Sequence, residues 1–406
     1  MASLIDKERL NDEFAFHCGF RQDGSCTSLE KAAILSVVYA NKEAQIDLSS
    51  ERTIFILSTT KGNVDLLDMR LSDMRYETSQ ISYLKSQIYL WHTAELITKF
   101  FKNPNTPIVV SVACISGAAA QIVAMRELKS GNYDHAVVVG VDLLSKFIIS
   151  GFQSFKALSP TLCQPFDKNR CGLNLGEAAA TMIFRHKILD MRCETQDVRQ
   201  SDVRCQKSQI PYLKSHISLV AGTVRNDSCH ISAPSRTGEG SLRALSSILN
   251  TQISNPKSQI PNLKSQISNP KSQIPNLTSQ IAFINAHGTA TPYNDAMEMN
   301  AIVRSGLQHI PVNSLKSYFG HTLGAAGVVE SVISMKALNE GLILKTLGFE
   351  ESEQFPPLAG DLGGGKQLTL NVCKENMKTD KKCFIKMMSG FGGVNAALLF
   401  ATDYTN

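Results

Sequence analysis

The stretch from Pro107 to Gly131, PIVVSVACISGAAAQIVAMRELKSG, joins an apolar run, one cysteine and a helical pattern. The β-branched run from Ile108 to Val112 predicts a short buried strand. Small and regularly spaced apolar residues after Cys114 predict a helix that ends near Gly131. A thiol at this turn would lie at the positive end of the helix dipole, which favours the thiolate and offers backbone N–H donors. The pattern therefore predicts a nucleophile, although a lone cysteine in such a segment is more often a small buried side chain.

With 406 residues, 43% of them hydrophobic, the chain can bury one large core or two medium ones, and its length suggests two or three domains. The net charge of +5 includes six lysines of a repeated phrase, and without them basic and acidic residues nearly balance. We therefore expect no nucleic-acid partner, because phosphate binding needs a clustered basic surface. No apolar run approaches the roughly 18 residues of a membrane span, so we expect no membrane association. The ten cysteines form no C-x-x-C pair and no secretory segment follows the charged start, which predicts reduced thiols and a cytoplasmic location.

Strand-like apolar runs alternate with helical stretches, which predicts an α/β fold with a largely parallel sheet covered by helices. In the first half the pattern predicts helices within 1–50 and strands at 53–57, 108–112, 135–141 and 178–184. In the second half it predicts strands at 217–224, 281–285, 310–315, 383–387 and 396–401, and helices at 240–249, 296–307 and 325–338. If the halves are equivalent, the first half lacks one strand at its front.

A seven-residue phrase, such as ISNPKSQ or IPNLKSQ, repeats four times between residues 253 and 280, with related copies at 78–90 and 206–219. Seven is the coiled-coil period, but a proline in each unit removes a helix hydrogen bond and favours extended geometry. We therefore expect extended, mobile surface insertions, which loops tolerate at small entropic cost. A docking strap is the alternative interpretation; a short DNA repeat that falls in loops accounts for the phrases without a selected role.

Two histidines stand among small residues downstream. His287 follows a predicted strand in FINAHGTATP, and His321 precedes a predicted helix in KSYFGHTLGAAGVVES. Taken singly, each is more often structural than catalytic. A glycine-rich turn, SGFGGVNAALLF, starts at Ser389 and lacks the G-x-G-x-x-G spacing of a nucleotide-binding loop.

Four motifs in this order, ACISGAAA, NAHGTATP, LKSYFGHTLGAAGVVES and SGFGGVNAALLF, resemble the elongating β-ketoacyl-[acyl carrier protein] synthases of the thiolase-like superfamily. The segment from Gly151 to Phe184 resembles theirs as well. The resemblance implies a thiolase-like fold with two pseudo-duplicated βαβ halves in a layered αβαβα arrangement. Residues 1–190 would form the half with the nucleophile and 191–406 the half with both histidines. Low-complexity insertions would lie at about 72–90, 191–216 and 252–280.

The resemblance also implies a reaction. Cys114 would take an acyl group from the phosphopantetheine of acyl carrier protein, and His287 and His321 would donate hydrogen bonds to the enolate formed when malonyl-acyl carrier protein loses carbon dioxide. Claisen condensation would then yield a β-ketoacyl product for fatty acid, polyketide or aryl polyene synthesis. No cofactor or metal would be bound by the chain. Its partners would be acyl carrier protein and a second subunit, in a homodimer or in a heterodimer with a related synthase.

Further residues match positions with roles in the family. Lys316 and Glu330 would support His321, and the backbone N–H groups of Cys114 and Phe391 would form an oxyanion hole, with Phe391 also a gate. The glutamate is equally interpreted as a helix cap or salt-bridge partner. His230 matches a family histidine to which we assign no role. The residues expected to hold the pantetheine arm or substrate are Thr289, Thr291, Gly392 and Gly393.

The chain departs from the family pattern in places. Relatives begin with a strand ahead of the region matching LNDEFAF, which we expect to be central in its sheet; its absence here predicts a gap and suggests an internal start codon or a damaged gene. Cys171 replaces an acidic residue and Ser389 an aromatic one, and the insertion at 72–90 affects the expected dimer interface and pocket floor. The alternatives are therefore a non-catalytic chain-length partner subunit, which usually lacks the cysteine, a truncated inactive synthase, or a biosynthetic thiolase.

Overall fold

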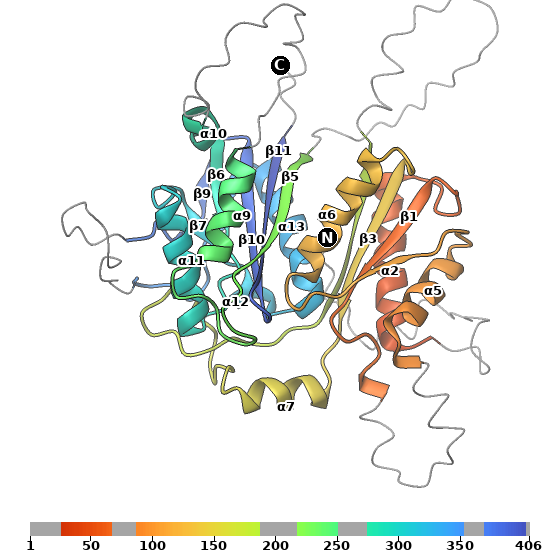
Figure 1. Cartoon of the computed structure of the whole chain (residues 1–406), viewed down its shortest axis with the longest axis horizontal. Helices are drawn as coiled ribbons and strands as arrows, with labels where there is room; N and C mark the ends of the chain where they lie inside the picture. Colours follow the sequence, from red (N-terminus) through yellow and green to blue (C-terminus); the bar gives the residue numbers. More distant parts are fainter. Residues whose placement is uncertain (1–25, 67–86, 187–216, 251–273, 353–368, 403–406) are drawn as a thin grey trace, which may run out of the picture.

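The computed structural model describes residues 26–66, 87–186, 217–250, 274–352 and 369–402. The first 25 residues of the region 1–50 that was predicted to be helical lie outside these residues, as do most of the repeated phrases. Within them, two sheets face each other with helices between them and on both outer faces (Figure 1). The predicted αβαβα layering is confirmed.

The first sheet has four strands among the described residues, in the order β2-β1-β3-β4. Strands β2, β1 and β3 are parallel, and β4 alone runs antiparallel. Each apolar run predicted in this half forms a strand, although β2 ends two residues early. The strands are β1 (Thr53–Ser58), β2 (Ile108–Val110), β3 (His135–Asp142) and β4 (Ala178–Arg185).

The second sheet has five strands in the order β5-β11-β10-β6-β7. Again one strand, β11, is antiparallel to the others, so the sheet is largely parallel as predicted. Strands β10 and β11 form a hairpin that turns at the glycine-rich segment. The strands are β5 (Ile217–Asn226), β6 (Ile281–Asn285), β7 (Val312–Asn313), β10 (Cys383–Gly390) and β11 (Val394–Thr402).

The first strand of each half was expected to be central in its sheet, and the second sheet contradicts this expectation. Its first strand, β5, lies at the sheet edge beside β11 and not in the middle. The three parallel strands β1, β2 and β3 of the first sheet pair with one another without a gap. The prediction of a central gap is therefore wrong among the described strands: by equivalence with the second sheet, a fifth strand would pair with the outer edge of β4 and not between β1 and β3.

The helices form three layers. Helices α6 (Ser116–Lys129) and α13 (Ala326–Asn339) contact both sheets and lie between them. Helices α2 (Ser28–Ala44) and α5 (Leu90–Phe100) cover the outer face of the first sheet, and α9 (Glu239–Leu249) with α11 (Pro292–Arg304) cover that of the second (Figure 1). The shorter elements are α7 (Lys146–Ser154), α10 (Ile274–Gln280), α12 (Lys316–Phe319), the 3-10 helix η3 (Leu323–Ala325), β8 (Leu342–Ile343) and β9 (Met377–Lys378).

The two central helices approach each other closely because glycines face one another. A Cβ atom at Gly327 would lie 2.4 Å from the backbone nitrogen of Ala118, and one at Gly117 would lie 2.8 Å from that of Val328. The buried amide of Gln121 donates to the carbonyl of Gly327 at 2.9 Å. This contact brings the segment after Cys114 and the helix after His321 together in the core.

The last repeated unit corrects a second prediction. Residues Ile274–Gln280 form α10, although the repeats were expected to be extended. Pro275 is the second residue of this helix, and a proline is tolerated in the first turn because its missing N–H would be unpaired there. Leu277 is buried in the core beneath the second sheet, so tertiary packing stabilises the turn.

Two further predictions concern thiols and membranes. Six cysteines of the described residues are free thiols, whereas Cys26 is disulfide-bonded, so the prediction of reduced thiols is wrong for Cys26. None of the helices in the part of the chain that the structure describes is long and apolar enough to cross a bilayer.

Candidate active site

Cys114 lies in a tight turn that its neighbours hold in place. Ala113 has a positive φ of 44°, which bends the chain between β2 and α6. The hydroxyl of Ser116 accepts a hydrogen bond from the Val112 N–H at 2.8 Å and donates to the carbonyl of Ala113 at 2.6 Å. The helix begins at Ser116, two residues after the cysteine. The predicted strand–cysteine–helix order is thus confirmed, with an intervening turn.

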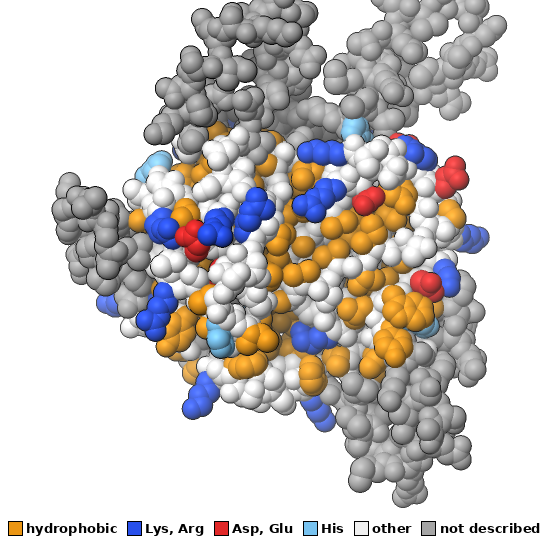
Figure 2. Space-filling view, in the orientation of Figure 1, with side chains coloured by type: hydrophobic (Ala, Val, Ile, Leu, Met, Phe, Trp, Pro, Cys, Tyr) orange, Lys and Arg blue, Asp and Glu red, His pale blue; other side chains and the backbone are white. Residues whose placement is uncertain are grey.

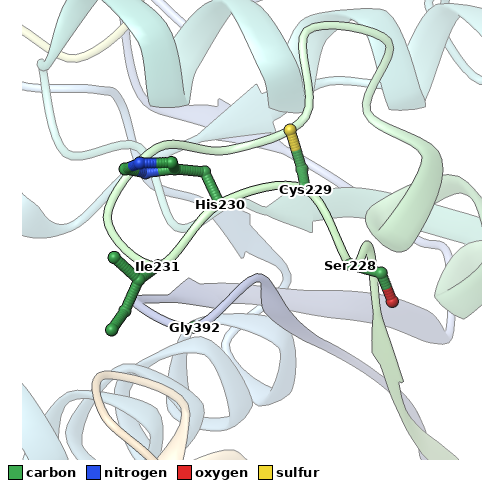
Figure 3. Close-up of a pocket in the computed structure, with 5 residues that line it drawn as sticks. All are labelled: Ser228, Cys229, His230, Ile231 and Gly392. Carbon is green, nitrogen blue, oxygen red and sulfur yellow. The ribbon is translucent and has the colours of Figure 1, made fainter.

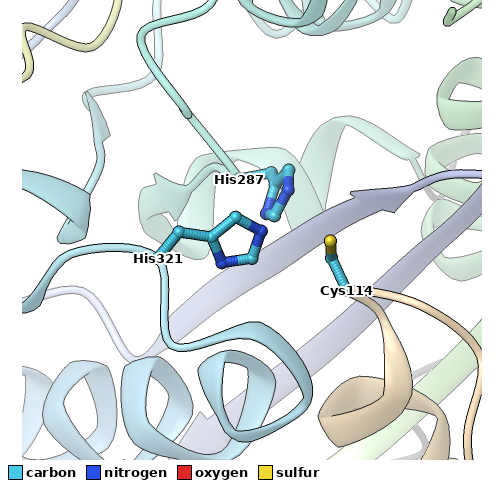
Figure 4. Close-up of side chains that lie close together, drawn as sticks. All are labelled: Cys114, His287 and His321. Carbon is cyan, nitrogen blue, oxygen red and sulfur yellow. The ribbon is translucent and has the colours of Figure 1, made fainter. Parts of the chain in front are cut away.

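Three predicted residues meet in the interior (Figure 4). The Sγ atom of Cys114 and one ring nitrogen each of His287 and His321 all lie within 4.8 Å of one another. The two imidazole rings are nearly perpendicular, at 82°, with centroids 5.0 Å apart. The histidines follow β6 and α12 of the second half, whereas the cysteine precedes α6 of the first half. The site therefore lies between the halves.

A backbone donor sets the tautomer of His321. The N–H of Leu323 donates to its Nδ1 atom at 3.2 Å. Because Nδ1 must then be the acceptor, the neutral ring carries its proton on Nε2. Nε2 is buried and has no hydrogen-bond partner among the described residues. His321 therefore presents an unused N–H donor in the interior.

Carboxylates at the start of α11 hold the loop that carries His287. The N–H groups of His287 and Gly288 each donate to Glu298, at 2.7 Å. The N–H groups of Thr289 and Ala290 donate to the neighbouring Asp295, at 3.0 and 3.1 Å. Burial raises the pKa of Glu298 to about 7, although these N–H donors oppose the rise. Two carboxyl groups of helix α11, which follows this loop, thereby fix the backbone at His287.

Two buried lysines share one buried glutamate beside the histidines. Lys316 and Lys386 are fully buried, and Glu330 is 3% exposed. The Nζ atom of Lys316 donates to Oε1 of Glu330, and that of Lys386 donates to Oε2 at 2.5 Å. Burial alone would raise the pKa of Glu330, but the two ammonium groups lower it below its usual value. The predicted partners Lys316 and Glu330 are therefore together, and Lys386 is a third member that the sequence analysis missed.

The histidines are neutral at physiological pH. Burial lowers the pKa of His321 well below its usual value, and the charges of Lys316, Lys61 and Lys386 lower it further. The pKa of His287 is likewise lowered by burial, by Lys316, by His321 and by Lys386. Lys316 contacts Glu330 and acts on His321 through its charge, while the orientation of His321 is set by Leu323. Neutral imidazoles suit hydrogen-bond donation to a developing oxyanion.

The cysteine is a protonated thiol in the resting protein. Burial raises the pKa of Cys114 to about 11, and the positive charges of Lys61 and Lys316 offset only part of that rise. The expectation that the helix start would favour the thiolate is therefore wrong for the free protein. Burial is the stronger effect, because removing a thiolate from water is more unfavourable than the attraction of the two lysines is favourable.

Lys61 is placed by a network at the end of the first sheet. Asp142, the last residue of β3, accepts hydrogen bonds from the N–H groups of Thr60, at 2.9 Å, and Gly324, at 2.7 Å. These contacts tie the loop after β1 to the segment that follows His321. The Nζ atom of Lys61 donates to the Thr60 hydroxyl at 2.6 Å.

The glycine-rich turn approaches Cys114 from the second sheet. A Cβ atom at Gly390 would lie 3.2 Å from the backbone nitrogen of Cys114. Phe391 is 41% exposed and packs on two rings of the α7 region, Phe152 and Phe155, with centroids 6.2 and 5.6 Å away. In the orientation of Figure 1, α7 lies in the lower part of the molecule, and Figure 2 shows exposed hydrophobic side chains in that region. The next residues, Gly392 and Gly393, have φ of 87° and 69°, which favours glycine.

The loop after β5 forms a surface pocket against this turn (Figure 3). The N–H of Gly392 donates to the carbonyl of Ile231 at 2.7 Å, and the carbonyl of Gly392 accepts from Asn226 at 2.8 Å. His230 is exposed here and lies outside the cysteine–histidine group. The pocket is lined by Ser228, Cys229, His230, Ile231 and Gly392.

Two predicted threonines lie in the loop after His287. Their hydroxyl groups are 2.8 Å apart, and Thr289 is buried whereas Thr291 is partly exposed. The hydroxyls therefore lie between the buried histidine and the surface. Their expected contact with a pantetheine arm stays a prediction.

The three donor atoms of Cys114, His287 and His321 also form a group that could hold a metal ion. Thiol and imidazole are ligands of soft and borderline metals. However, the charges of Lys61, Lys316 and Lys386 act on the same atoms, and positive charge opposes a cation. The arrangement fits a site for an anionic group better.

Comparisons with known proteins place the chain in a family. A profile described as β-ketoacyl synthase, N-terminal domain, matches residues 4–187, and one described as β-ketoacyl synthase, C-terminal domain, matches residues 252–350. The chain belongs to the β-ketoacyl synthase family. The N-terminal profile contains the cysteine, and the C-terminal profile contains both histidines. The fold is accordingly the thiolase-like fold of ketosynthases.

The relatives compared with the chain share 22–26% of their residues with it. The chain is 26% identical to 3-oxoacyl-[acyl-carrier-protein] synthase 2 of Staphylococcus aureus, over 74% of its own length and 63% of that protein's. It therefore spans less than two thirds of the curated relative. A β-ketoacyl synthase structure from Burkholderia phymatum has a TM-score of 0.73 at 22% identity, over 93% of this chain and 83% of that one. A ketosynthase in complex with its chain length factor, from Xenorhabdus doucetiae, has a TM-score of 0.68 at 24% identity, over 93% and 82%.

Two groups near the site had only weak signals in the sequence. Lys386 is the one charged residue in the apolar strand CFIKM, and a lysine in a buried strand needs a partner. Lys61 follows the predicted strand TIFIL by a few residues, at the strand end where sites form in parallel sheets. Neither signal names the partner, because Glu330 and Cys114 are distant in the sequence.

Proposed function

We propose that the chain is a β-ketoacyl-[acyl carrier protein] synthase that condenses an acyl group on Cys114 with malonyl-acyl carrier protein. The single observation that carries the proposal is the buried group in which the Cys114 sulfur lies within 4.8 Å of ring nitrogens of His287 and His321. One nucleophile and two neutral imidazoles supply what an acyl transfer followed by a decarboxylation needs.

The first half-reaction is acyl transfer. The Cys114 sulfur attacks the thioester carbonyl of an acyl carrier protein, the bond to the pantetheine sulfur breaks, and the thiol proton ends on the departing pantetheine thiol. The developing oxyanion needs two donors. The approach of Gly390 to the Cys114 nitrogen supports the backbone N–H groups of Cys114 and Phe391 in that role.

The second half-reaction is decarboxylation and condensation. The bond between the malonyl carboxylate and C2 breaks, carbon dioxide leaves, and the electron pair forms an enolate on the remaining thioester. The Nε2–H of His321 is a free donor for that oxygen, and His287 is the second imidazole beside it. C2 then attacks the acyl-Cys114 carbonyl, and the cysteine sulfur leaves as a thiolate that takes up a proton from water.

The charge of Lys316 helps to keep His321 neutral, and Glu330 holds Lys316 in place through their ion pair. Thr289, Thr291, Gly392 and Gly393 are proposed to hold the pantetheine arm, since they lie in loops beside the histidine and the Phe391 gate. We propose no bound cofactor or metal, because the substrates bring their own phosphopantetheine.

We propose acyl carrier protein as the partner, in keeping with the name of the Staphylococcus aureus relative. The neighbour that pairs with a chain length factor favours a heterodimer, with a homodimer as the alternative. A chain-length subunit without activity remains the second candidate function, but the presence of Cys114 argues against it. Membrane and nucleic acid are not proposed as partners, and a cytoplasmic location stays a prediction.

The test is acyl transfer with the full chain. Incubation with a labelled octanoyl-acyl carrier protein should give a covalent adduct on the Cys114 peptide, measured by mass spectrometry. Cys114→Ala should give none, and Cys229→Ala, an exposed thiol of the Figure 3 pocket, should load as the wild type does. A wild type without adduct, or a Cys114→Ala protein with as much, contradicts the proposal.

A further inference from the structure

Lys386 is fully buried in the middle of β10, and its neighbours on both sides in this strand are apolar. Its backbone is paired with Asn285 of β6, two residues before His287. Its Nζ atom donates to Glu330 at 2.5 Å and to the carbonyl of Ala286 at 3.3 Å. The side chain of Lys386 thus contacts both Glu330, the ion-pair partner of Lys316, and the backbone that precedes His287.

The charges of this trio do not balance. Lys316 and Lys386 are two ammonium groups, and Glu330 is their one shared carboxylate. The excess of one positive charge lies in the interior, where a charge interacts more strongly than in water. The trio therefore holds one ammonium group more than a simple ion pair, and the carboxyl group of Glu298 outside the trio also acts on Lys386. An excess positive charge is useful where an anion must be bound or formed.

The proposed reaction brings such an anion to this place. The malonyl carboxylate enters as an anion, and the enolate that replaces it is an anion as well. In the proposed reaction both anions lie beside His287 and His321. Lys386 helps to lower the pKa values of these two histidines. A fixed positive charge behind two neutral donors stabilises the enolate without itself donating a proton.

We propose that Lys386 is a positioning residue of the decarboxylation half-reaction. It anchors the backbone before His287. It also adds a positive charge to the Lys316–Glu330 pair, and the resulting cationic trio stabilises the malonyl carboxylate and the enolate. The proposal rests on the proposed synthase function. The acyl transfer to Cys114 involves no such anionic substrate, so the two half-reactions separate the role of Lys386 from a general effect on the fold.

The pH range of the effect follows from the surroundings of Lys386. Burial lowers its pKa to about 8, with Glu330 opposing and Lys316 adding to the fall. The lysine is therefore charged at pH 7 and loses its proton as the pH rises through about 8. The rate of decarboxylation should fall over the same range. The charged or titratable groups that face it are Glu330 of α13, Lys316 of α12, Glu298 of α11 and the rings of His287 and His321.

The experiment compares Lys386→Met with Lys378→Met, which removes an exposed lysine of β9. Loading from octanoyl-acyl carrier protein and carbon dioxide release from malonyl-acyl carrier protein are measured from pH 6.5 to 9.5. We expect Lys386→Met to load within about threefold of the wild type, to lose at least tenfold in decarboxylation at pH 7, and to lose the alkaline fall. Lys378→Met should match the wild type in both assays.

A double variant tests the charge itself. In Lys386→Met with Glu330→Gln the remaining Lys316 again gives one excess positive charge, so decarboxylation should recover at least threefold over the single variant. No recovery, an unchanged decarboxylation in Lys386→Met, or an equal loss of loading overturns the proposal. If Lys386→Met does not fold, the wild-type profile decides, and a rate that does not fall between pH 7.5 and 8.5 overturns it. A wild type that neither loads nor decarboxylates contradicts the synthase function instead.

Discussion

The Nδ1 atom of His321 accepts a hydrogen bond from the backbone N–H of Leu323, at 3.2 Å. This contact is made within two residues, so it depends on the local turn before η3 and not on a distant partner. It fixes which nitrogen carries the proton and leaves Nε2–H as the donor toward Cys114 and His287. The role proposed for His321 therefore depends on the position of one N–H group.

Replacing His321 tests that donor. Gln places an amide N–H near the Nε2 position, whereas Ala places nothing there. We expect His321→Ala to lose at least about 100-fold in malonyl decarboxylation, because one oxyanion donor contributes that much, and His321→Gln to recover part of it. Carbon dioxide release measures the effect, and acyl loading is the control. Equal rates for the two variants would falsify the donor role.

The pKa values of the histidines predict how stability changes with pH. A base whose folded pKa is lowered binds fewer protons in the folded than in the unfolded protein, so the free energy of unfolding falls as the pH drops below about 6.5. Removing one such ring in His321→Gln should reduce this fall by up to about 1.4 kcal/mol per pH unit. Urea unfolding at pH 7, 6 and 5 measures the difference between wild type and variant. Parallel curves would show that His321 titrates normally.

The pKa of Cys114 predicts slow alkylation of this thiol in the protein without substrate. Because burial raises this pKa to about 11, the rate of modification by iodoacetamide should keep rising with pH beyond 9, where an ordinary thiol levels off. The modified Cys114 peptide is quantified by mass spectrometry, since exposed Cys171 and Cys229 also react. A rate on Cys114 that is already constant at pH 8 contradicts the assignment of a resting thiol.

Close packing of α6 and α13 predicts the effect of one methyl group. A Cβ atom at Gly327 would meet the Ala118 nitrogen at 2.4 Å, so Gly327→Ala should lower the free energy of unfolding by about 1 to 3 kcal/mol and slow both half-reactions. The matched control is Gly151→Ala in α7, where a Cβ atom meets nothing within 4 Å, and stability should stay or rise by up to about 1 kcal/mol. Urea denaturation compares the two, and equal stabilities would exclude the proposed tight contact.

The sequence predicted most of the regular structure because apolar periodicity is a local signal. The strand at 281–285 has the predicted bounds, and the run at 53–57 is one residue longer than predicted. Errors occurred where long-range packing outweighs local preference. Leu277 binds the last repeat into the core as a helix, and the edge position of β5 follows from its pairing with β11, which no local pattern contains.

The sequence by itself determined the order of the motifs, the candidate nucleophile Cys114, and His287 and His321 as candidates. Only the tertiary structure decided that their reactive atoms meet, because they come from the two halves and are joined through the packing of α6 on α13. It also decided the protonation of the site. Burial and the shared charges of Lys316, Glu330 and Lys386 shift the pKa values, and neither burial nor a partner's charge can be calculated for residues whose neighbours in space are distant in the chain.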